Sequence, residues 1–258
     1  MVCGPAGNAS LLFAEEMPHL PEEEMSDLVH ELQQQRDEPI LLSTIKVSLL
    51  QQPEAIKMLP HGGLALKRVI DVFIAGAAFL ILLPLMILLS LLVKLSSPGP
   101  IFFRWNVVGK AGRPFVGYKF RTMFDGADRI REQLCENNEM TGVFFKMQND
   151  PRVTPIGRTL RRYSLDELPQ LWSVLKGDMS LVGPRPTQVF EYEQLTDWQR
   201  QRVQVKPGAI SLWIVSGKTT DFDQMIRLDL EYINRWSIWL DLRILLKAVP
   251  YVAFGKNS

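Results

Sequence analysis

The sequence predicts an α/β fold, a small and mostly helical domain with short strands that follows one long apolar helix. The helix is predicted by the run from Val72 to Val93, which contains 22 residues and no charge. The mixed domain is predicted because short apolar segments, bounded by glycine and proline, alternate with longer segments of helical pattern further along the chain. A chain of 258 residues can bury one good core with an appendage.

The charged residues divide the chain into an acidic tail and a basic domain. Residues 1–60 hold ten acidic side chains and three basic ones, whereas residues 61–258 hold 26 bases and 18 acids. From this composition we expect residues 1–60 to form a partly disordered tail, with a docking or regulatory arm as the alternative. The expected boundaries are 1–60 for the tail, 61–97 for the apolar helix and 98–258 for the domain.

The histidines narrow the chemistry that the domain can perform. All of them precede residue 62: His19, His30 and His61. If residues 62–258 contain an active site, a Ser-His-Asp triad, a Cys-His pair and an HExxH zinc motif are therefore excluded there. Carboxylates, lysines, arginines and tyrosines remain as candidates for catalysis.

The apolar helix fits two membrane topologies. Its 22 uncharged residues would make a helix about 33 Å long, enough to cross the hydrocarbon of a bilayer. Pro84 stands near the middle, where it removes a backbone hydrogen bond and bends the helix. Basic residues flank both ends, Lys67 and Arg68 before and Lys94 and Arg104 after, and such residues favour the cytoplasmic side. A plain span and a re-entrant helix that breaks at Pro84 and returns both remain open.

The other expected elements follow in order along the chain. Strands are expected at 101–104, 114–119, 141–147 and 212–215, and helices at 126–137, 156–163, 166–175 and 224–254. The last helix carries Trp236, Trp239, Arg243 and Lys247 among apolar residues. A core helix explains this pattern, and so does an amphipathic helix at a bilayer interface.

Asp166 and Glu167 are the candidate catalytic residues. On a helix, neighbouring side chains diverge by about 100°, so the two acids could take different roles. The alternative is a purely structural role, because Ser164 and Glu167 have the spacing of a capping box at the start of a helix. Pro169 argues against an ordinary helix start, since within the first turns it would forfeit a backbone hydrogen bond.

Cationic residues accompany the acid pair, and together they predict a site for a phosphate and a divalent cation. Three arginines precede the pair in sequence: Arg158, Arg161 and Arg162. Arg185 lies between two prolines, so it is either a pre-organised phosphate ligand or a solvated side chain on a stiff loop. Lys119 and Arg121 alternate on an expected strand and would point to one face, although a surface strand explains them equally well.

From Lys67 onward the sequence resembles the bacterial sugar transferases, the monotopic polyprenyl-phosphate phosphoglycosyl transferases. The resemblance covers about three quarters of the chain and rests on motifs in this order: KRVID, SPGPIFFR, YKFRTM, SLDELPQLWSVLKGDMSLVGPRP and NRWSIWLDLRILLK. It implies a re-entrant membrane helix broken near Pro84 and a cytosolic α/β catalytic domain with interfacial amphipathic helices. It also implies the bacterial inner membrane as the location, with the catalytic domain on the cytoplasmic face.

The resemblance further implies a reaction and residue roles. Asp166 would be the nucleophile, Glu167 would help to hold Mg²⁺, and Lys119, Arg161 and Arg185 would contact phosphates. Arg121 joins this phosphate-binding set because of its alternation with Lys119. A sugar-1-phosphate would pass from a UDP-sugar to polyprenyl (undecaprenyl) phosphate, with release of UMP, in the first membrane step of exopolysaccharide, O-antigen or glycoconjugate synthesis.

The segment 207–218 reads PGAISLWIVSGK where PGITGLWQVSGR is common in this family, and its departures include Ser211, Ile214 and Lys218. A non-catalytic membrane scaffold that binds a nucleotide sugar is therefore kept as an alternative. A glycosyltransferase that moves the sugar without its phosphate, and releases UDP, is a third reading. The expected partners are a UDP-sugar, polyprenyl phosphate and the bilayer but no nucleic acid, and the sequence leaves a homodimer open.

Overall fold

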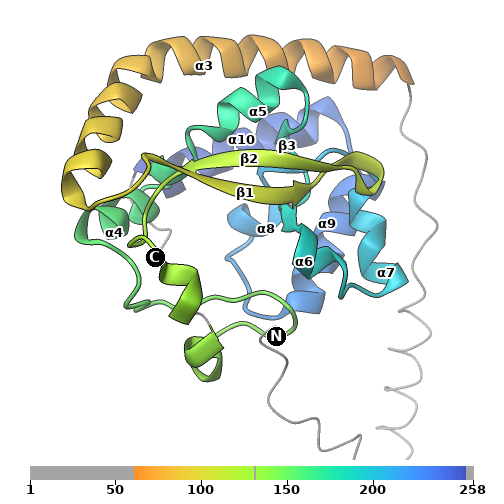
Figure 1. Ribbon diagram of the computed structural model, residues 1–258. Coiled ribbons are helices and arrows are strands. Elements are labelled where there is room, and N and C mark those ends of the chain that lie inside the picture. Colours follow the sequence, from red (N-terminus) through yellow and green to blue (C-terminus); the bar gives the residue numbers. More distant parts are fainter. Residues whose placement is uncertain (1–60, 131, 254–258) are drawn as a thin grey trace, which may run out of the picture. The chain divides into compact units, whose positions relative to one another are not determined.

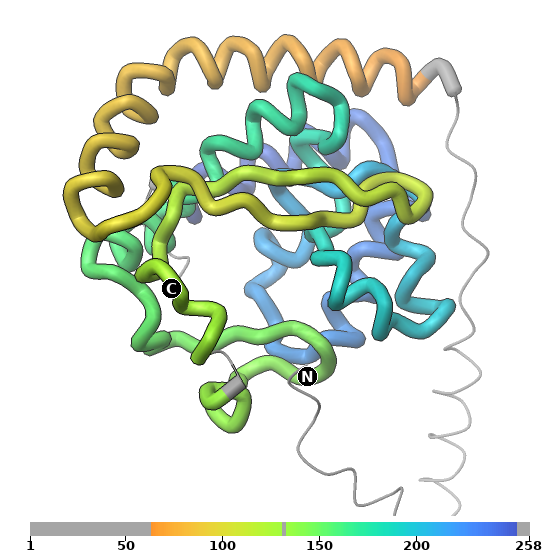
Figure 2. The backbone as a smooth tube through the Cα atoms, viewed as in Figure 1, coloured from red at the N-terminus to blue at the C-terminus, as the bar shows by residue number. Residues whose placement is uncertain are grey.

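A computed structural model of the chain describes residues 61–130 and 132–253 (Figures 1 and 2). The acidic tail expected at 1–60 lies outside these residues. The described part combines helices with two small β-sheets, so the mixed fold class predicted from the sequence is confirmed.

The long apolar helix is α3 (His61–Ser96), a continuous element of 36 residues with Pro84 inside it. Figure 1 shows that α3 bends between its orange and yellow parts, and Pro84 accounts for a bend because it breaks the backbone hydrogen-bond ladder. Its outward side chains are apolar, and Phe73, Leu80 and Ile81 are 76%, 71% and 75% exposed. Among the described residues α3 is the one helix long and apolar enough to cross a membrane.

The first sheet is a hairpin with a short third strand. β1 (Phe102–Val108) pairs antiparallel with β2 (Pro114–Phe120), and β4 (Thr187–Gln188) adds to β1. The connection contains the 3₁₀ turn η1 (Lys110–Gly112), in which Gly112 adopts a φ of 77° without the steric cost that a side chain would add. The two strands predicted here are confirmed, and β1 runs further than its apolar start indicated.

The second sheet joins two short segments that the sequence did not reveal as strands. β3 (Ser180–Val182) lies parallel to β5 (Gly208–Ile210). The strands approach so closely where β3 ends that a Cβ atom on Gly208 would lie 2.0 Å from the backbone nitrogen of Gly183. Glycine is therefore required, and the sheet places the loop after β3 beside the chain that follows β5.

Helices form most of the remaining structure. They are α4 (Pro155–Arg162), α5 (Gln170–Lys176), α6 (Val189–Tyr192), α7 (Asp197–Arg200), α8 (Leu212–Val215), α9 (Phe222–Asn234) and α10 (Ile238–Ala253), with 3₁₀ turns η2 (Ala127–Ile130), η3 (Glu132–Asn137), η4 (Leu165–Glu167) and η5 (Gln201–Gln204). The helix predicted at 224–254 is thus two helices. The second begins after Ser237, whose hydroxyl accepts a hydrogen bond from the backbone of Leu240.

Three other element predictions were wrong, for local reasons. The helix expected at 126–137 is two 3₁₀ turns. The strand expected at 141–147 is absent because Asn138 binds this segment through its side chain, with bonds to the backbone of Met140, Lys146 and Phe144. The strand expected at 212–215 is the single helical turn α8, since a short apolar run does not distinguish helix from strand.

The residues of α3 after Pro84, here called its C-terminal arm, pack onto the hairpin and α4, and those before Pro84 form its N-terminal arm. Met86, Leu89 and Val93 form a buried cluster with Phe120 and Leu160. The larger core lies around α9 and includes buried Met225, Ile226 and Ile233 together with Val174, Met179 and Ala75. Because Ala75 belongs to the N-terminal arm of α3, both arms of this helix contribute to the packing of the domain.

Arg121 fixes the C-terminal end of α3. Its side chain is 6% exposed and donates hydrogen bonds to the carbonyl oxygens of Pro98 (2.6 Å), Ser97 (2.6 Å) and Val93 (3.3 Å). These bonds satisfy carbonyl groups that a helix end leaves without a partner, and the positive charge suits the negative end of the helix dipole. The predicted common face of Lys119 and Arg121 is therefore wrong: β2 ends at Phe120, and Arg121 turns toward α3.

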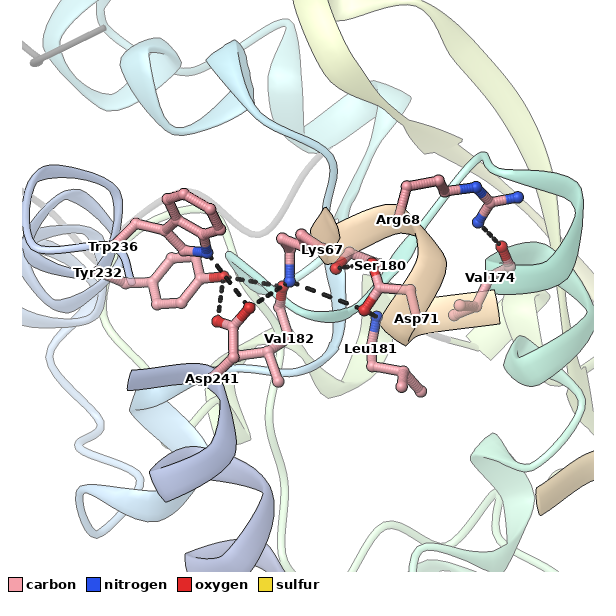
Figure 3. A network of polar contacts seen from close by, with 10 residues as sticks. All are labelled: Lys67, Arg68, Asp71, Val174, Ser180, Leu181, Val182, Tyr232, Trp236 and Asp241. Atoms are coloured by element: carbon pink, nitrogen blue, oxygen red, sulfur yellow. Dashed lines mark hydrogen bonds and ion pairs between the residues drawn. The ribbon is translucent and has the colours of Figure 1, made fainter. Parts of the chain in front are cut away.

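A polar network fixes the other end of α3 (Figure 3). The Lys67 ammonium lies 2.6 Å from Asp241 and 3.7 Å from Asp71. Asp71 in turn accepts a hydrogen bond of 2.7 Å from the Ser180 hydroxyl of β3, and Asp241 accepts one of 2.8 Å from Tyr232 of α9. The network therefore links the N-terminal arm of α3 with β3, α9 and α10.

The role of Arg121 can be tested by its replacement. Arg121→Met should lower the free energy of unfolding by about 3 kcal/mol, because buried carbonyl groups lose a charged donor. Arg113→Met removes an exposed arginine at the opposite end of β2 and should change stability by less than about 0.5 kcal/mol. Denaturant unfolding in detergent micelles measures both values, and equal effects would contradict the assignment.

Candidate functional site

Asp166 and Glu167 lie on η4, a short turn between α4 and α5 rather than inside a helix. The capping box is not formed, since Ser164 adopts a left-handed φ of 54° and makes no side-chain cap hydrogen bond. Pro169 is the residue directly before α5, where its missing N–H costs nothing. Both acids therefore lie outside a regular α-helix, and the capping box considered as the alternative role of Ser164 and Glu167 is wrong.

Apolar residues hold the η4 turn in place. Leu165 and Leu168 flank the two acids and pack against the buried cluster that contains Met86 and Val93 of α3 and Phe120 of β2. The acid pair is therefore supported by the long apolar helix and by the hairpin. Its position depends on how the C-terminal arm of α3 packs.

Lys119 is the closest cationic partner of the pair. Its ammonium lies 2.6 Å from the Oε1 atom of Glu167, and it also stands over the ring of Trp105 at 4.5 Å from the centroid. Arg161 is held differently, because its Nε donates a hydrogen bond of 2.9 Å to the hydroxyl of Thr122. Two of the predicted cations thus come from β2 and α4 to the same acidic turn.

The two carboxyl groups have pKa values displaced in opposite directions. Burial raises the pKa of Asp166 to about 6, and the adjacent Glu167 charge adds to the rise, while Lys119 and Arg161 oppose it. Burial also acts to raise the pKa of Glu167, but the charge and hydrogen bond of Lys119, with the charge of Arg185, outweigh it and hold this pKa below its ordinary value. Asp166 is therefore the more basic carboxylate of the pair.

Arg185 reaches the site from the loop Gly183–Pro186. Its guanidinium stacks over the ring of Trp213 at 5.0 Å and lies 5.8 Å from the ring centroid of Phe144. It lines an open hollow of ≈ 290 Å³ together with Lys119 and Glu167. The structure thus brings together Lys119, Glu167 and Arg185, which lie far apart in the sequence.

The same hollow contains residues that the sequence did not single out for a site. Its other lining residues are Trp105, Gln170, Pro186, Gly208, Ala209, Ser211 and Ile214. Ser211 and Ile214 are two of the departures noted in the sequence, and their place on the wall makes them candidates for ligand recognition. Trp105 lies outside the sequence motifs, and Gln170 lies inside the motif of the acid pair but was given no role there. Their place on the wall could be found only from the fold.

Lys218, the third departure, also belongs to this electrostatic environment. Burial lowers its pKa to about 8, the charges of Glu167 and Asp166 act against this shift, and those of Arg185 and Lys146 favour it. Lys218 therefore adds a cation close to the acid pair. By contrast, Arg121 lies at the end of α3 and is not among the residues that line the hollow.

The acid pair fits Mg²⁺ only as a site shared with a ligand. Within residues 61–130 and 132–253 no group of three or more His, Cys, Asp or Glu side chains could hold a metal ion. Mg²⁺ is commonly bound by one or two carboxylates together with substrate phosphates and water. Glu167, with Asp166 beside it, supplies that minimal protein part.

Comparison with known proteins gives a consistent result over most of the chain. A family model described as bacterial sugar transferase matches residues 63–255. Galactosyl transferase CpsE of Streptococcus agalactiae serotype III is 44% identical over 207 residues, which are 79% of this chain and 46% of that protein. Exopolysaccharide production protein ExoY of Rhizobium meliloti is 38% identical over 204 residues, 77% of this chain and 90% of that protein.

A third similar protein has a name that states a reaction. UDP-glucose:undecaprenyl-phosphate glucose-1-phosphate transferase of Escherichia coli is 42% identical over 195 residues, which are 71% of this chain and 39% of that protein. The matched part is thus most of ExoY but less than half of the other two proteins.

The binding of a simple anion tests whether the cations that line the hollow form an anion site. Lys119→Met removes one positive charge from the hollow and should weaken the binding of inorganic pyrophosphate, in the presence of Mg²⁺, by about tenfold. Arg104→Met removes an exposed cation from the neighbouring strand and should leave the affinity unchanged. Isothermal titration calorimetry measures both, and equal affinities for wild type and Lys119→Met would refute a cationic anion site.

Proposed function

Since the chain belongs to the bacterial sugar transferase family, we propose that it transfers a sugar-1-phosphate from a UDP-sugar to polyprenyl phosphate and releases UMP. The acceptor class follows the name of the Escherichia coli relative, which gives undecaprenyl phosphate. The reaction would be the first membrane step in the synthesis of an exopolysaccharide, an O-antigen or another glycoconjugate. The observation that carries the proposal is the carboxylate pair on η4 with cations from three other segments around it.

In the first step, Asp166 is assigned as the nucleophile. One of its carboxylate oxygens forms a bond to the phosphorus that bears the sugar. The bond from this phosphorus to the bridging oxygen of the diphosphate breaks, and its electron pair leaves with UMP. A carboxylate attacks as an anion and needs no base to remove a proton, which fits the lack of histidine after residue 61.

In the second step, the sugar phosphate moves from Asp166 to the lipid. An oxygen of polyprenyl phosphate forms a bond to the same phosphorus. The acyl phosphate bond breaks, and its electron pair returns to the carboxylate. The products are a polyprenyl diphosphate sugar and the original Asp166 carboxylate, so atoms and charge balance over the cycle.

The cations around the acid pair reduce the repulsion between the Asp166 carboxylate and the anionic diphosphate that it attacks. Lys119 and Arg185 face the hollow, and the charge of Arg161 acts on Asp166. Such fixed cations stabilise negative charge that develops in the transition state. Mg²⁺ held by Glu167 and the substrate phosphates would neutralise further phosphate charge.

The rival function is a non-catalytic scaffold that binds a nucleotide sugar. It is favoured by Ser211 and Ile214, which differ from the common family pattern and lie on the wall of the hollow. A scaffold would bind a UDP-sugar tightly without turnover across a panel of sugars. The intact group of Asp166, Glu167 and Lys119 favours the enzyme.

For the membrane helix we propose the re-entrant topology. Lys67 near the start of α3 and Arg121 beyond its end bind the same domain, and a plain span would have to separate these two ends by the full bilayer. The bend at Pro84 supplies the required change of direction. We place the catalytic domain on the cytoplasmic face of the bacterial inner membrane, since basic residues flank both ends of the apolar run.

α10 supplies a second apolar surface that suits the membrane interface. Trp239, Leu242, Leu246 and Val249 are 70%, 40%, 64% and 60% exposed, and their spacing places them on one side of the helix. Exposed tryptophan and leucine on an amphipathic helix fit the boundary between headgroups and acyl chains. We therefore propose that α10 lies in this boundary.

The nucleophile assignment predicts a selective loss of activity. Asp166→Asn keeps the size of the side chain but removes the anion, so UMP release should fall at least about 10³-fold. The assay contains purified protein, Mg²⁺, polyprenyl phosphate and a panel of UDP-sugars. Asp128→Asn makes the same change at an exposed site on η2 and should leave the rate unchanged. UMP release at the wild-type rate by Asp166→Asn would refute the nucleophile, and UDP as product would refute the reaction class.

The topology predicts that both ends of α3 react with reagents from one side. Ala65→Cys and Ser96→Cys introduce thiols at exposed positions in a chain whose Cys3 and Cys135 are serine. A membrane-impermeant maleimide should leave both unlabelled in intact cells and label both in inverted vesicles. Labelling of one position from each side would establish a plain span instead.

A further inference from the structure

We propose that the buried pair Arg202–Asp229 positions Arg185 for the reaction. The pair binds the backbone of Arg185 and thereby sets the direction of the guanidinium that faces the acid pair. This inference rests on the proposed function. It assigns a role to two residues that touch no substrate and that stood in no sequence motif.

The two residues come from different elements and meet in the interior. Arg202 lies in η5 and Asp229 in α9, and their side chains form an ion pair in which each is 1% exposed. Burial raises the pKa of Asp229 to about 6, although the charges of Arg202 and Arg185 oppose the rise. Arg202 and Arg185 thus favour the ionised form of this carboxyl against its burial.

Both backbone polar groups of Arg185 are bound by this pair. The N–H of Arg185 donates to Oδ1 of Asp229 at 3.3 Å, and the carbonyl oxygen of Arg185 accepts from Nη2 of Arg202 at 2.8 Å. Nη2 of Arg202 also donates to Oδ2 of Asp229. The contacts form a closed ring around one residue of the loop.

The loop is held at its start by β5 and at Arg185 by the ion pair. Pro184 and Pro186 have fixed φ angles and no N–H. Gly183 already donates its N–H to the carbonyl of Ile210 in β5 at 3.0 Å. The carbonyl oxygen of Pro184 accepts a hydrogen bond of 2.9 Å from the N–H of Gly208 in β5. β5 therefore fixes the first half of the loop, and the ion pair binds both backbone groups of Arg185 that follow.

The side chains of the loop and the pair also share an aromatic wall. Arg185 and Arg202 each place the guanidinium carbon 5.8 Å from the ring centroid of Phe144, and Arg185 stacks over Trp213 at 5.0 Å. These contacts leave the Arg185 guanidinium on the wall of the hollow with Glu167. A shift of the Arg185 backbone would therefore move the cation relative to the acid pair.

A buried ion pair is an expensive way to stabilise a fold. Removing two charges from water costs several kcal/mol per ion, and well-packed apolar residues often stabilise a protein as much or more. What the pair supplies in return is geometry, because its donors and acceptor fit one arrangement of the Arg185 peptide groups. The role inferred for the pair is therefore to position Arg185 rather than to stabilise the fold.

The test is a double-mutant cycle on kcat/KM for UMP release. Asp229→Asn should lower kcat/KM about 10- to 100-fold in the otherwise wild-type chain, since small displacements of a positioned group cost this much. In an Arg185→Ala background, where the positioned guanidinium is missing, the same change should cost less than about threefold. Equal costs in the two backgrounds would show a structural role only and would overturn the inference.

A matched control uses another buried ion pair. Arg152 and Asp150 lie 2.6 Å apart with side chains 4% and 3% exposed, and Asp150 bonds Arg152 rather than the Arg185 loop. The cost of Asp150→Asn in kcat/KM should be the same with and without Arg185→Ala. If its cost also vanished in the Arg185→Ala background, the coupling at Asp229 would be nonspecific and the inference would fail.

Two further measurements cover a variant that does not fold and a chain that releases no UMP. If Asp229→Asn does not fold, Arg202→Lys goes through the same cycle, because lysine keeps the charge but lacks the planar fork. If the wild-type chain releases no UMP, the proposed function is refuted, and the cycle is then measured on the affinity for Mg²⁺ and inorganic pyrophosphate. Coupling between Asp229 and Arg185 in that affinity supports the positioning role, and additivity refutes it.

Discussion

Buried polar contacts fix both ends of α3 to one domain, and the arrangement of the site depends on this constraint. Lys67 and Asp71 bind Asp241 and Ser180 at one end, and Arg121 binds the final carbonyl groups at the other. A buried charge is costly unless its partners are well placed. Each end of the helix therefore has a narrow range of positions, and α3 acts as part of the framework of the domain.

Several of the segments that carry the site pack against this helix or lead directly away from it. Lys119 lies on β2, two residues before Arg121, which binds the end of α3. Ser180 of β3 bonds Asp71 of α3, and β3 leads directly into the loop of Arg185. Leu165 and Leu168 pack the acidic turn onto the C-terminal arm of α3. A change in the bend of α3 would move these segments relative to one another, so the position of this apolar helix and the geometry of the site are physically linked.

Features that depend on a local sequence pattern could be predicted from the sequence. The apolar helix and the β1–β2 hairpin have long or well-bounded signals, and the motif around Asp166 identified the acidic turn. The sequence did not predict β3 and β5, because three-residue strands are defined by their partners. Arg121 was misplaced because alternation holds only within a strand, and the Arg202–Asp229 pair has no signal since its members lie in separate helical elements.

The proposed nucleophile implies a covalent sugar phosphate on Asp166, and mass spectrometry of the intact protein and its peptides detects such an adduct. The protein is mixed with Mg²⁺ and its UDP-sugar in the absence of polyprenyl phosphate. We expect a mass increase of one sugar phosphate on the peptide that contains Asp166, one UMP per adduct, and loss of the adduct when polyprenyl phosphate is added. Turnover with UMP release but without any adduct on this peptide would contradict the assignment of Asp166 as the nucleophile.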